Sequence, residues 1–283
     1  MMSLSAVRRF YADEIAAVSN LTSTALVDAL ATVPRERFVG DGPWVVFGES
    51  GGASARTTID SDPRRVYHNY AIALDPGRQL FNGVPALIAS AIDRLQLHAG
   101  QRVLHVGTGT GYYTALLAHI VGPGGCVTGL EVDADLAARA QRNLADLPWA
   151  TVEEGDGRGP FRDSFDAILV NAGVTHPEPA WLDAAAPGGR IVVPVTAAMA
   201  AMGTIGKGVL ILLEKQADGD FAAQVLTFVA IYSALGLRRD ELNRRIGEAL
   251  QRNPFPRIAR LRRGAHEADA GCWLHGDGWC LRT

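Results

Sequence analysis

The chain has 283 residues, of which 48% are hydrophobic and 20% are charged, and its formal net charge is −3. A globular chain of this length buries an ample core as one large domain or a domain with appendages, so its stability requires no disulfide or metal. The weakly acidic balance lacks the basic excess of nucleic-acid-binding proteins, so nucleic acid is not an expected partner.

The N-terminal part is predicted to consist of helices followed by a flap. Residues 5–33 have the periodicity of two amphipathic helices, with Asn20 or Thr22 as the cap of the second. Charged residues interrupt the apolar ones at the N-terminus, so we expect neither a signal peptide nor a membrane span. Residues 40–65 are rich in Gly, Ser, Asp and Arg without clear periodicity, which predicts a long loop or mobile flap.

A strand, a glycine-rich turn and a helix are predicted in succession between residues 103 and 121. The apolar run of the strand stops at Gly107, which is followed by Gly109 and Gly111. These glycines let the backbone turn sharply and let a ligand approach the main chain, where the next helix presents unpaired N–H groups. The GxGxG spacing differs from the GxGxxG of dinucleotide sites, which favours a nucleotide-type ligand without a pyrophosphate.

An acidic residue follows at the spacing expected for a ribose ligand. The next apolar strand, residues 127–132, contains Glu131 near its end. At this distance from a glycine turn, an acidic side chain accepts hydrogen bonds from ribose hydroxyls. Three glycines in one turn also serve the plain packing of a helix on a strand, but the acidic strand end favours the ligand-binding interpretation.

Strands and helices alternate through the central region. This alternation predicts an α/β fold with a doubly wound, mostly parallel sheet and a ligand crevice at the carboxyl ends of its strands. Asp156 follows one of these strands in a turn, where it would meet the ligand. The strands are expected at residues 67–74, 103–106, 127–132, 151–154, 165–170, 190–195, 210–214 and 225–231, and the helices at 85–95, 112–121 and 133–147. The last two strands are predicted to form a hairpin, after which the sheet ends.

The C-terminal part is predicted to be helical and rich in arginine over residues 238–263. Such a basic run is usually a solvated face, and a site for an anionic partner is the alternative. The final residues carry two tryptophans among glycines and would cover either a sheet edge, the more ordinary arrangement, or the substrate pocket. Cys126, Cys272 and Cys280 are odd in number and lack a CxxC pair, which indicates neither a disulfide framework nor a zinc cluster, and a reducing cytoplasm is the expected compartment.

Several segments together resemble the protein-L-isoaspartate O-methyltransferases in order and spacing. The resemblance runs from about residue 26 to residue 231 and is carried by VPRERFV at 33–39, VLHVGTGTGY at 103–112, LEVD at 130–133, GDG at 155–157 and PGGRIVVPV at 187–195. It implies a class I, Rossmann-like methyltransferase fold that uses S-adenosylmethionine and no metal. The expected parts are N-terminal helices and flap at 1–80, a methyltransferase core at 81–233 and a helical C-terminal extension at 234–283.

The resemblance also implies roles for individual residues. Gly107, Gly109 and Gly111 match the family's turn around the methionine part of the cofactor. Glu131 matches its ribose ligand, and Asp156-Gly157 its adenine contact. The neighbouring residues that complete the expected cofactor site are Thr108, Val132 and Asn171.

Two positions at the reaction centre depart from the family's pattern. Where the family has Thr-Ile-Ser, this chain has Leu80-Phe81-Asn82, and where it has an acidic residue before the glycine turn, this chain has His105. Asn82 is expected either to donate its amide N–H to an acceptor carboxylate or to cap the helix that begins near Pro85. His105 is expected to hydrogen-bond the cofactor or substrate, to act as a base toward a hydroxyl or amine, or to be a buried structural histidine.

The implied activity is methyl transfer to a carboxylate oxygen of a peptide, a protein or a related acceptor, and we expect weak or absent activity on generic isoaspartyl peptides. A carboxylate with a pKa of about 4 is already ionised at neutral pH, so the transfer needs positioning and exclusion of water but no general base. The alternatives are a methyltransferase for a small-molecule or modified-peptide acceptor, a non-catalytic S-adenosylmethionine-binding protein, and an oxidoreductase, against which the GxGxG spacing argues. The flap and the C-terminal tail are expected to close over the acceptor.

Overall fold

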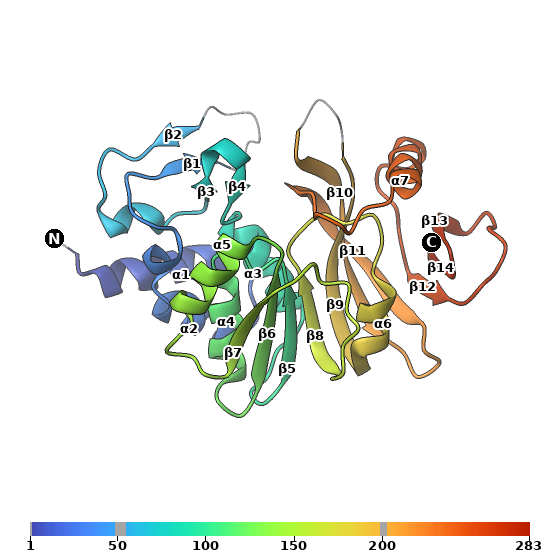
Figure 1. The fold of residues 1–283 in the computed structure, drawn as a ribbon, viewed down its shortest axis with the longest axis horizontal. Helices are drawn as coiled ribbons and strands as arrows, with labels where there is room; N and C mark the ends of the chain where they lie inside the picture. Colours follow the sequence, from blue (N-terminus) through green and yellow to red (C-terminus); the bar gives the residue numbers. More distant parts are fainter. Residues whose placement is uncertain (1, 49–54, 199–202) are drawn as a thin grey trace. The chain divides into compact units, whose positions relative to one another are not determined.

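The computed structural model describes residues 2–48, 55–198 and 203–283, and the chain divides into two compact units (Figure 1). Unit 1 comprises Met1–Gln101 and Thr108–Glu154, and unit 2 comprises Arg102–Gly107 and Gly155–Thr283. The chain therefore leaves unit 2 and enters unit 1 inside the glycine turn. These units do not follow the boundaries expected at residues 80 and 233, which stay predictions.

Unit 1 begins with the two predicted helices, α1 (Leu4–Ser19) and α2 (Thr24–Thr32), which pack on one another. The predicted cap of the second helix is wrong. Ser23 is its N-cap and accepts a hydrogen bond from the amide of Leu26 at 3.2 Å, whereas Asn20 ends α1 in the left-handed conformation. The hydroxyl of Thr22 instead donates to Asp93 at 3.0 Å, which ties the connection to the helix that follows the small sheet.

A small antiparallel sheet follows, with the order β2-β1-β3-β4. Its strands are β1 (Val45–Phe47), β2 (Arg56–Thr57), β3 (Ala71–Asp75) and β4 (Leu80–Phe81). The loop predicted over residues 40–65 is therefore wrong at β1 and β2, because short strands of three and two residues carry too little alternation to be recognised. The middle of the predicted flap, residues 49–54, lies outside the described residues.

The strand predicted from residue 67 begins only at Ala71, and Arg35 explains why. This fully buried arginine lies in the 3₁₀ turn Arg35–Phe38 and donates to the carbonyl oxygens of Val66 at 2.7 Å, His68 at 2.9 Å and Tyr70 at 2.9 Å. These carbonyls bind a guanidinium instead of a neighbouring strand. A charge buried far along the sequence thus overrides the local strand pattern.

The rest of unit 1 carries the predicted alternation. Strands β6 (Cys126–Glu131) and β7 (Ala150–Glu154) pair in parallel, and α4 (Tyr112–Val121) and α5 (Ala134–Asn143) pack against them. Helix α3 (Pro85–Arg94) begins with a proline in its first turn, as predicted, and lies against α1 and α2. Helix α5 ends at Asn143, four residues before its predicted end, ahead of a proline that cannot continue a helix.

Unit 2 contains a mixed sheet. Strands β5 (Arg102–Val106), β8 (Phe165–Val170) and β9 (Ala185–Ala198) are parallel, whereas β10 (Ile205–Lys215) and β11 (Phe221–Tyr232) add on in antiparallel fashion. The predicted hairpin between the last two is confirmed by the pairing of Lys215 with Phe221. A short helix, α6 (Pro179–Ala184), precedes β9. Alternating parallel strands and helices confirm the predicted α/β class.

The C-terminal extension differs most from the prediction. Only α7 (Asp240–Arg252) is helical, and three strands follow, β12 (Arg260–Arg263), β13 (Cys272–Gly276) and β14 (Trp279–Arg282). Strand β12 pairs with β11 and β14 with β12, so the tail continues the sheet and covers its edge, as the more ordinary interpretation predicted. Cys272 and Cys280 lie there in a cluster with two histidines, which the spacing of the cysteines alone did not predict.

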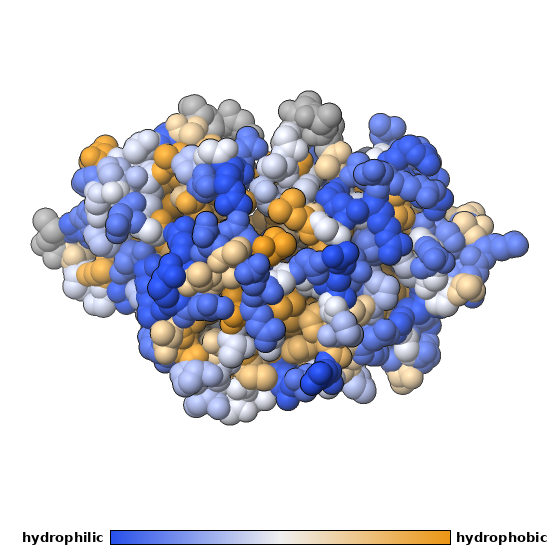
Figure 2. Space-filling view, viewed as in Figure 1, coloured by the Kyte–Doolittle hydropathy of each residue, from blue (hydrophilic) through white to orange (hydrophobic). Residues whose placement is uncertain are grey.

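The arginine-rich run is a solvated face for most of its members. Figure 2 shows mainly hydrophilic residues over α7, where Arg244 and Arg245 pair with glutamates one turn away. Arg238 is the exception, because its guanidinium donates to the carbonyl oxygens of Gly173 and Thr196, each at 2.8 Å. Among the described residues, none of the helices is both long enough and apolar enough to cross a membrane.

Candidate active site

The glycine turn has the conformation that its sequence predicts. Gly107, Gly109 and Gly111 have φ values of 81°, 56° and 95°, in the region that side chains rarely adopt. Gly111 is the N-cap of α4, and a Cβ there would lie 3.2 Å from Leu144 Cδ1. A Cβ on Gly109 would meet only Leu74 Cδ1, at 3.8 Å. The turn therefore requires glycine for its path and leaves the backbone of Gly109 open to approach.

Glu131 ends β6 in unit 1 and is tied to that turn. Its side chain is only 7% exposed, and its carboxylate accepts the amide of Gly109 at 2.7 Å and that of Asp133 at 3.1 Å. Burial raises the pKa of Glu131, and the two amides oppose the rise because they stabilise the charged form. Each carboxylate oxygen offers two lone pairs, so each retains a direction for a further donor such as a ribose hydroxyl.

The residues next to Glu131 fix the strand end. Asp133 accepts the amide of Leu136 at 3.0 Å as the N-cap of α5 and forms an ion pair with Arg78. Val132, between the two acids, is 42% exposed and offers apolar surface of the kind that a planar ring covers. Thr108 is buried and donates its amide to the carbonyl of Leu130 at 3.2 Å. Unit 1 thus brings Thr108, Gly109, Glu131 and Val132 together at one strand end.

Unit 2 contains the other predicted cofactor residues. The amide of Asn171, directly after β8, donates to the carbonyl of Val106 at 2.8 Å, and a Cβ on Gly107 would lie 3.4 Å from the Asn171 carbonyl atoms. A Cβ on Gly157 would lie 2.7 Å from Val106 Cγ1, so that position tolerates only glycine. The ends of β5 and β8 and the turn at Gly157 are therefore in close contact.

Asp156 is held by its neighbour Arg158, through both the side chain and the main-chain amide of that residue. Its carboxylate accepts the Nε–H of Arg158 at 2.7 Å and the amide of the same residue at 3.1 Å. The hydrogen bonds from Arg158 lower the pKa of Asp156. The carbonyl of the next residue, Gly157, accepts the indole N–H of Trp181 at 2.7 Å. Trp181 thus fixes the turn, while the carboxylate of Asp156 can exchange its present donor for a ligand.

His105 is a fully buried residue of β5. Burial lowers its pKa to about 3, so the imidazole is neutral at physiological pH. A general base works best with a pKa near the operating pH, and this histidine is far below it. Of the expected alternatives, the buried environment favours a structural or hydrogen-bonding histidine over a base.

Asn82 follows β4 in unit 1 and is not the cap of the next helix. The amide of Ala86, in the first turn of α3, donates to Asn69 Oδ1 at 2.9 Å, and no cap bond comes from Asn82. The capping alternative for Asn82 is therefore wrong. Its side chain is 7% exposed, and among the described residues its Oδ1 has no hydrogen-bond partner. A buried polar group in this state is suited to bind a ligand.

One polar network in unit 2 was missed by sequence reasoning. His176 is buried with its Nδ1 3.0 Å from Thr175 Oγ1 and its Nε2 2.9 Å from Glu178 Oε1. The same threonine hydroxyl accepts the amide of Arg239 at 3.0 Å. The network fastens the segment after Asn171 to the start of the C-terminal extension. The signal in the sequence was a histidine and a glutamate two residues apart, just beyond the carboxyl end of a strand.

Comparison with known proteins gives consistent results. The family model described as protein-L-isoaspartate(D-aspartate) O-methyltransferase matches residues 56–236. The protein-L-isoaspartate O-methyltransferase of Rhodopseudomonas palustris is 30% identical over 229 residues, which are 78% of this chain and 89% of the relative. That of Anaeromyxobacter dehalogenans is 43% identical over 140 residues, which are 48% of this chain and 63% of the relative.

Solved structures share the fold. A protein-L-isoaspartate O-methyltransferase superimposes with a TM-score of 0.64 at 22% identity, over 87% of this chain and 69% of its own. A Plasmodium falciparum protein described as a putative protein-L-isoaspartate O-methyltransferase, in complex with S-adenosyl-L-homocysteine, gives 0.59 at 16% identity, over 80% and 97% of the two chains. The class I methyltransferase fold predicted from the sequence is thereby confirmed.

Proposed function

Because the chain belongs to the protein-L-isoaspartate(D-aspartate) O-methyltransferase family, we propose that it methylates a carboxylate oxygen of a peptide or protein. The chain is an S-adenosylmethionine-dependent methyltransferase. The observation that carries the proposal furthest is the buried Glu131 carboxylate, fixed by the amides of Gly109 and Asp133 beside a glycine turn. This arrangement suits a ligand that has a ribose and no pyrophosphate.

The residues that would hold the cofactor belong to two groups. In unit 1, Glu131 would accept the ribose hydroxyls, Val132 would cover the adenine, and the open backbone at Thr108, Gly109 and Gly111 would bind the methionine part. In unit 2, Gly107, Asp156, Gly157 and Asn171 are the residues that the family resemblance assigns to the cofactor, Asp156 to its adenine. S-adenosylmethionine supplies a methyl group on a sulfonium that is its own leaving group.

The acceptor contact is assigned to Asn82. A buried amide oxygen without a partner, such as Asn82 Oδ1, costs about 1–3 kcal/mol, which a ligand that bonds to the side chain recovers. Rotation of the amide presents its N–H₂ group in place of its oxygen, and this group would donate to an acceptor carboxylate. The absence of a cap bond from Asn82 to α3 supports this role. Asn82 therefore orients the carboxylate, and it stands where relatives of the family would place a serine.

No base is needed for this chemistry. The acceptor carboxylate is ionised at neutral pH, so positioning and the exclusion of water are the contributions of the protein. The low pKa of His105 speaks against a hydroxyl or amine acceptor that would need its proton removed by this residue. We also propose that the enzyme works in a reducing compartment such as the cytoplasm, since its three cysteines, all in the described part of the chain, form no disulfide.

The test is incubation with methyl-labelled S-adenosylmethionine and an isoaspartyl peptide beside its aspartyl counterpart. We expect label on the isoaspartyl peptide in a base-labile form, because carboxyl methyl esters hydrolyse in mild base. The aspartyl peptide is the matched control and should gain none. Label that survives base would show methylation of nitrogen or of a hydroxyl, and it would overturn the carboxylate proposal.

A further inference from the structure

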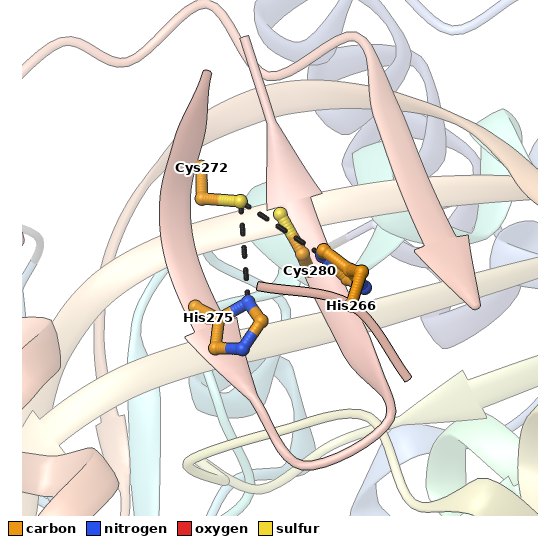
Figure 3. A group of neighbouring side chains, drawn as sticks. All are labelled: His266, Cys272, His275 and Cys280. Atoms are coloured by element: carbon orange, nitrogen blue, oxygen red, sulfur yellow. Dashed lines mark hydrogen bonds between the residues drawn. The ribbon is translucent and has the colours of Figure 1, made fainter. Parts of the chain in front are cut away.

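The C-terminal extension gathers four metal-ligating side chains at one place (Figure 3). His266 comes from the segment between β12 and β13, Cys272 and His275 from β13, and Cys280 from β14. One ligand atom from each lies within 4.8 Å of all the others. Figure 3 shows the two sulfur atoms and the two rings directed toward a common space. Cys280 is buried and the other three are half-buried, so the group is not a chance collection of exposed side chains.

The spacing of the ligand atoms is close to that of a tetrahedral zinc site. The sulfur of Cys272 lies 3.9 Å from His266 Nε2 and 4.0 Å from His275 Nδ1. Zinc bonds of about 2.3 Å to sulfur and about 2.0 Å to nitrogen place the ligand atoms about 3.3–3.8 Å apart in a tetrahedron. The two sulfur–nitrogen distances exceed the tetrahedral value of about 3.5 Å by about half an ångström, and all four ligand atoms lie within 4.8 Å of one another, a spread that rotations of the side chains would close.

The hydrogen bonding of His266 leaves the correct nitrogen available. Its Nδ1 lies 2.8 Å from the carbonyl oxygen of Gly264, so this nitrogen carries the proton and donates. The tautomer is thereby fixed with a lone pair on Nε2, the nitrogen that faces Cys272. Histidines that bind metals commonly donate their other ring N–H to a carbonyl or carboxylate in this way. The carbonyl thus orients the ring as a ligand.

A guanidinium lies beside one of the two sulfur atoms. Arg282 Nη1 lies 3.7 Å from Cys272 Sγ and 2.8 Å from Asp269 Oδ2, so the guanidinium is held beside the sulfur by a second acidic partner. Zinc binds cysteine as the thiolate, so binding of the ion would displace the proton of each thiol. Two thiolates and two neutral imidazoles balance the charge of one divalent cation.

We propose that His266, Cys272, His275 and Cys280 bind a structural zinc ion. A tetrahedral set of two thiolates and two imidazoles suits zinc better than magnesium or calcium, which prefer oxygen ligands. The protein fills all four positions, which leaves no open coordination site and marks a structural rather than catalytic metal. The site lies beyond residues 56–236, the part that matches the family model, so it is a feature of the extension and does not depend on the proposed methyl transfer.

The expected consequence is that the metal fastens the end of the chain. The four ligands span residues 266–280 and link the segment after β12 to both strands of the terminal hairpin. Strand β13 is the edge strand of the sheet and pairs with β14 alone among the described strands, so a metal that joins both strands to a third segment would support that edge. Strands β13 and β14 should therefore lose protection when the metal is removed.

The test uses the full chain, purified under reducing conditions without chelator after expression with added zinc. Elemental analysis should give about one zinc per chain, since four closed ligands bind one ion tightly. Replacing the metal with cobalt should give the visible bands of a tetrahedral ion and the near-ultraviolet thiolate charge-transfer band. His266→Ala, outside the strands, should lose most of the metal. His119→Ala, an exposed histidine of α4, is the matched control and should retain it.

A second measurement needs no variant. Amide hydrogen exchange in residues 272–282 should become at least about tenfold faster after chelation, while exchange in α4 stays unchanged. Less than about one-tenth of a zinc per folded chain, with no cobalt bands, would overturn the proposal, because a closed site of this kind binds far more tightly. A disulfide between Cys272 and Cys280 in the reduced preparation, detected by mass, would also overturn it.

Discussion

Two acidic residues assigned to the cofactor differ in how the protein holds them. Glu131, in unit 1, is 7% exposed and bound by the main-chain amides of Gly109 and Asp133. Asp156, in unit 2, is more exposed, and one main-chain amide and the flexible side chain of the same residue, Arg158, bind it. The pKa of Glu131 is raised by burial, whereas that of Asp156 is lowered by its arginine.

Glu131 is therefore a preorganised contact, whereas Asp156 must exchange hydrogen-bond partners before it binds a ligand. Glu131 has already lost water and rotational freedom when the protein folds, so a ribose that binds to it gains hydrogen bonds in a region of low dielectric. Asp156 must give up part of its pairing with Arg158 and remains open to water, which weakens any contact that it makes. We therefore expect Glu131 to contribute more to cofactor affinity than Asp156.

The largest effect is expected for Glu131→Ala. Loss of charge-assisted hydrogen bonds of about 1.5–3 kcal/mol should weaken S-adenosylhomocysteine binding roughly 10- to 150-fold, as measured by calorimetric titration. Glu154→Ala, at the end of the neighbouring strand β7 and exposed, is the control and should bind as wild type. An unchanged dissociation constant for Glu131→Ala would remove the ribose assignment.

The next effect concerns the backbone beside Asp156. Gly157→Ala should lower the free energy of unfolding by about 1–3 kcal/mol, because its Cβ would lie 2.7 Å from Val106 Cγ1 at a positive φ. Gly109→Ala meets no atom nearer than 3.8 Å, so its cost is limited to the backbone conformation, about 1 kcal/mol. Urea unfolding of both variants measures the difference. Equal losses would show that the contact with Val106 is not tight.

The pH dependence of binding should distinguish the two carboxylates. The pKa of Glu131 lies above its ordinary value of 4.5 and that of Asp156 below 3.8, so acidification protonates Glu131 first. A protonated carboxyl is the weaker acceptor, so affinity for S-adenosylhomocysteine should fall as the pH falls through the raised pKa. In Glu131→Gln the affinity should stay flat over that range. If the affinity of the wild type fell only below the pKa of Asp156, then Asp156 rather than Glu131 would be the carboxylate that governs cofactor binding.

The smallest effect is expected for Asp156→Ala. An exposed, screened pair contributes about 0.2–1 kcal/mol, so binding of S-adenosylhomocysteine should weaken no more than about fivefold. Arg158→Ala removes the side-chain partner of the Asp156 carboxylate. This change should raise or lower the affinity for S-adenosylhomocysteine by a similarly small factor. If Asp156→Ala lost as much affinity as Glu131→Ala, the exposure of a carboxylate would not determine how much it contributes to cofactor binding.

The features that the sequence predicted correctly depend on neighbours along the chain. The strand, glycine turn and helix around Gly109 follow from hydrophobic runs and glycine spacing, and the structure places Glu131 against that turn as the spacing required. The parallel alternation and the hairpin of β10 and β11 were likewise encoded by local periodicity. In these cases the residues that determine the local structure lie within a window of about ten residues.

The features that were missed depend on residues far apart in the sequence. Arg35 binds the carbonyls of residues 66, 68 and 70, so the expected strand begins only at Ala71. Asn69 rather than Asn82 bonds to the start of α3. The C-terminal strands exist because β12 finds the edge of β11, which no local pattern reveals. The cluster of two cysteines and two histidines in the C-terminal extension was overlooked because the cysteines were counted without His266 and His275.

The central claim is that Asn82 orients an acceptor carboxylate in an S-adenosylmethionine-dependent transfer. The most direct measurement is kcat/KM for an isoaspartyl peptide with wild type, Asn82→Ser and Asn82→Ala, beside the dissociation constant for S-adenosylhomocysteine. We predict that Ser raises turnover of this peptide, and that Ala lowers turnover of the acceptor that wild type prefers by roughly tenfold or more, with cofactor affinity unchanged. Robust wild-type turnover of the isoaspartyl peptide that neither substitution alters would contradict the claim.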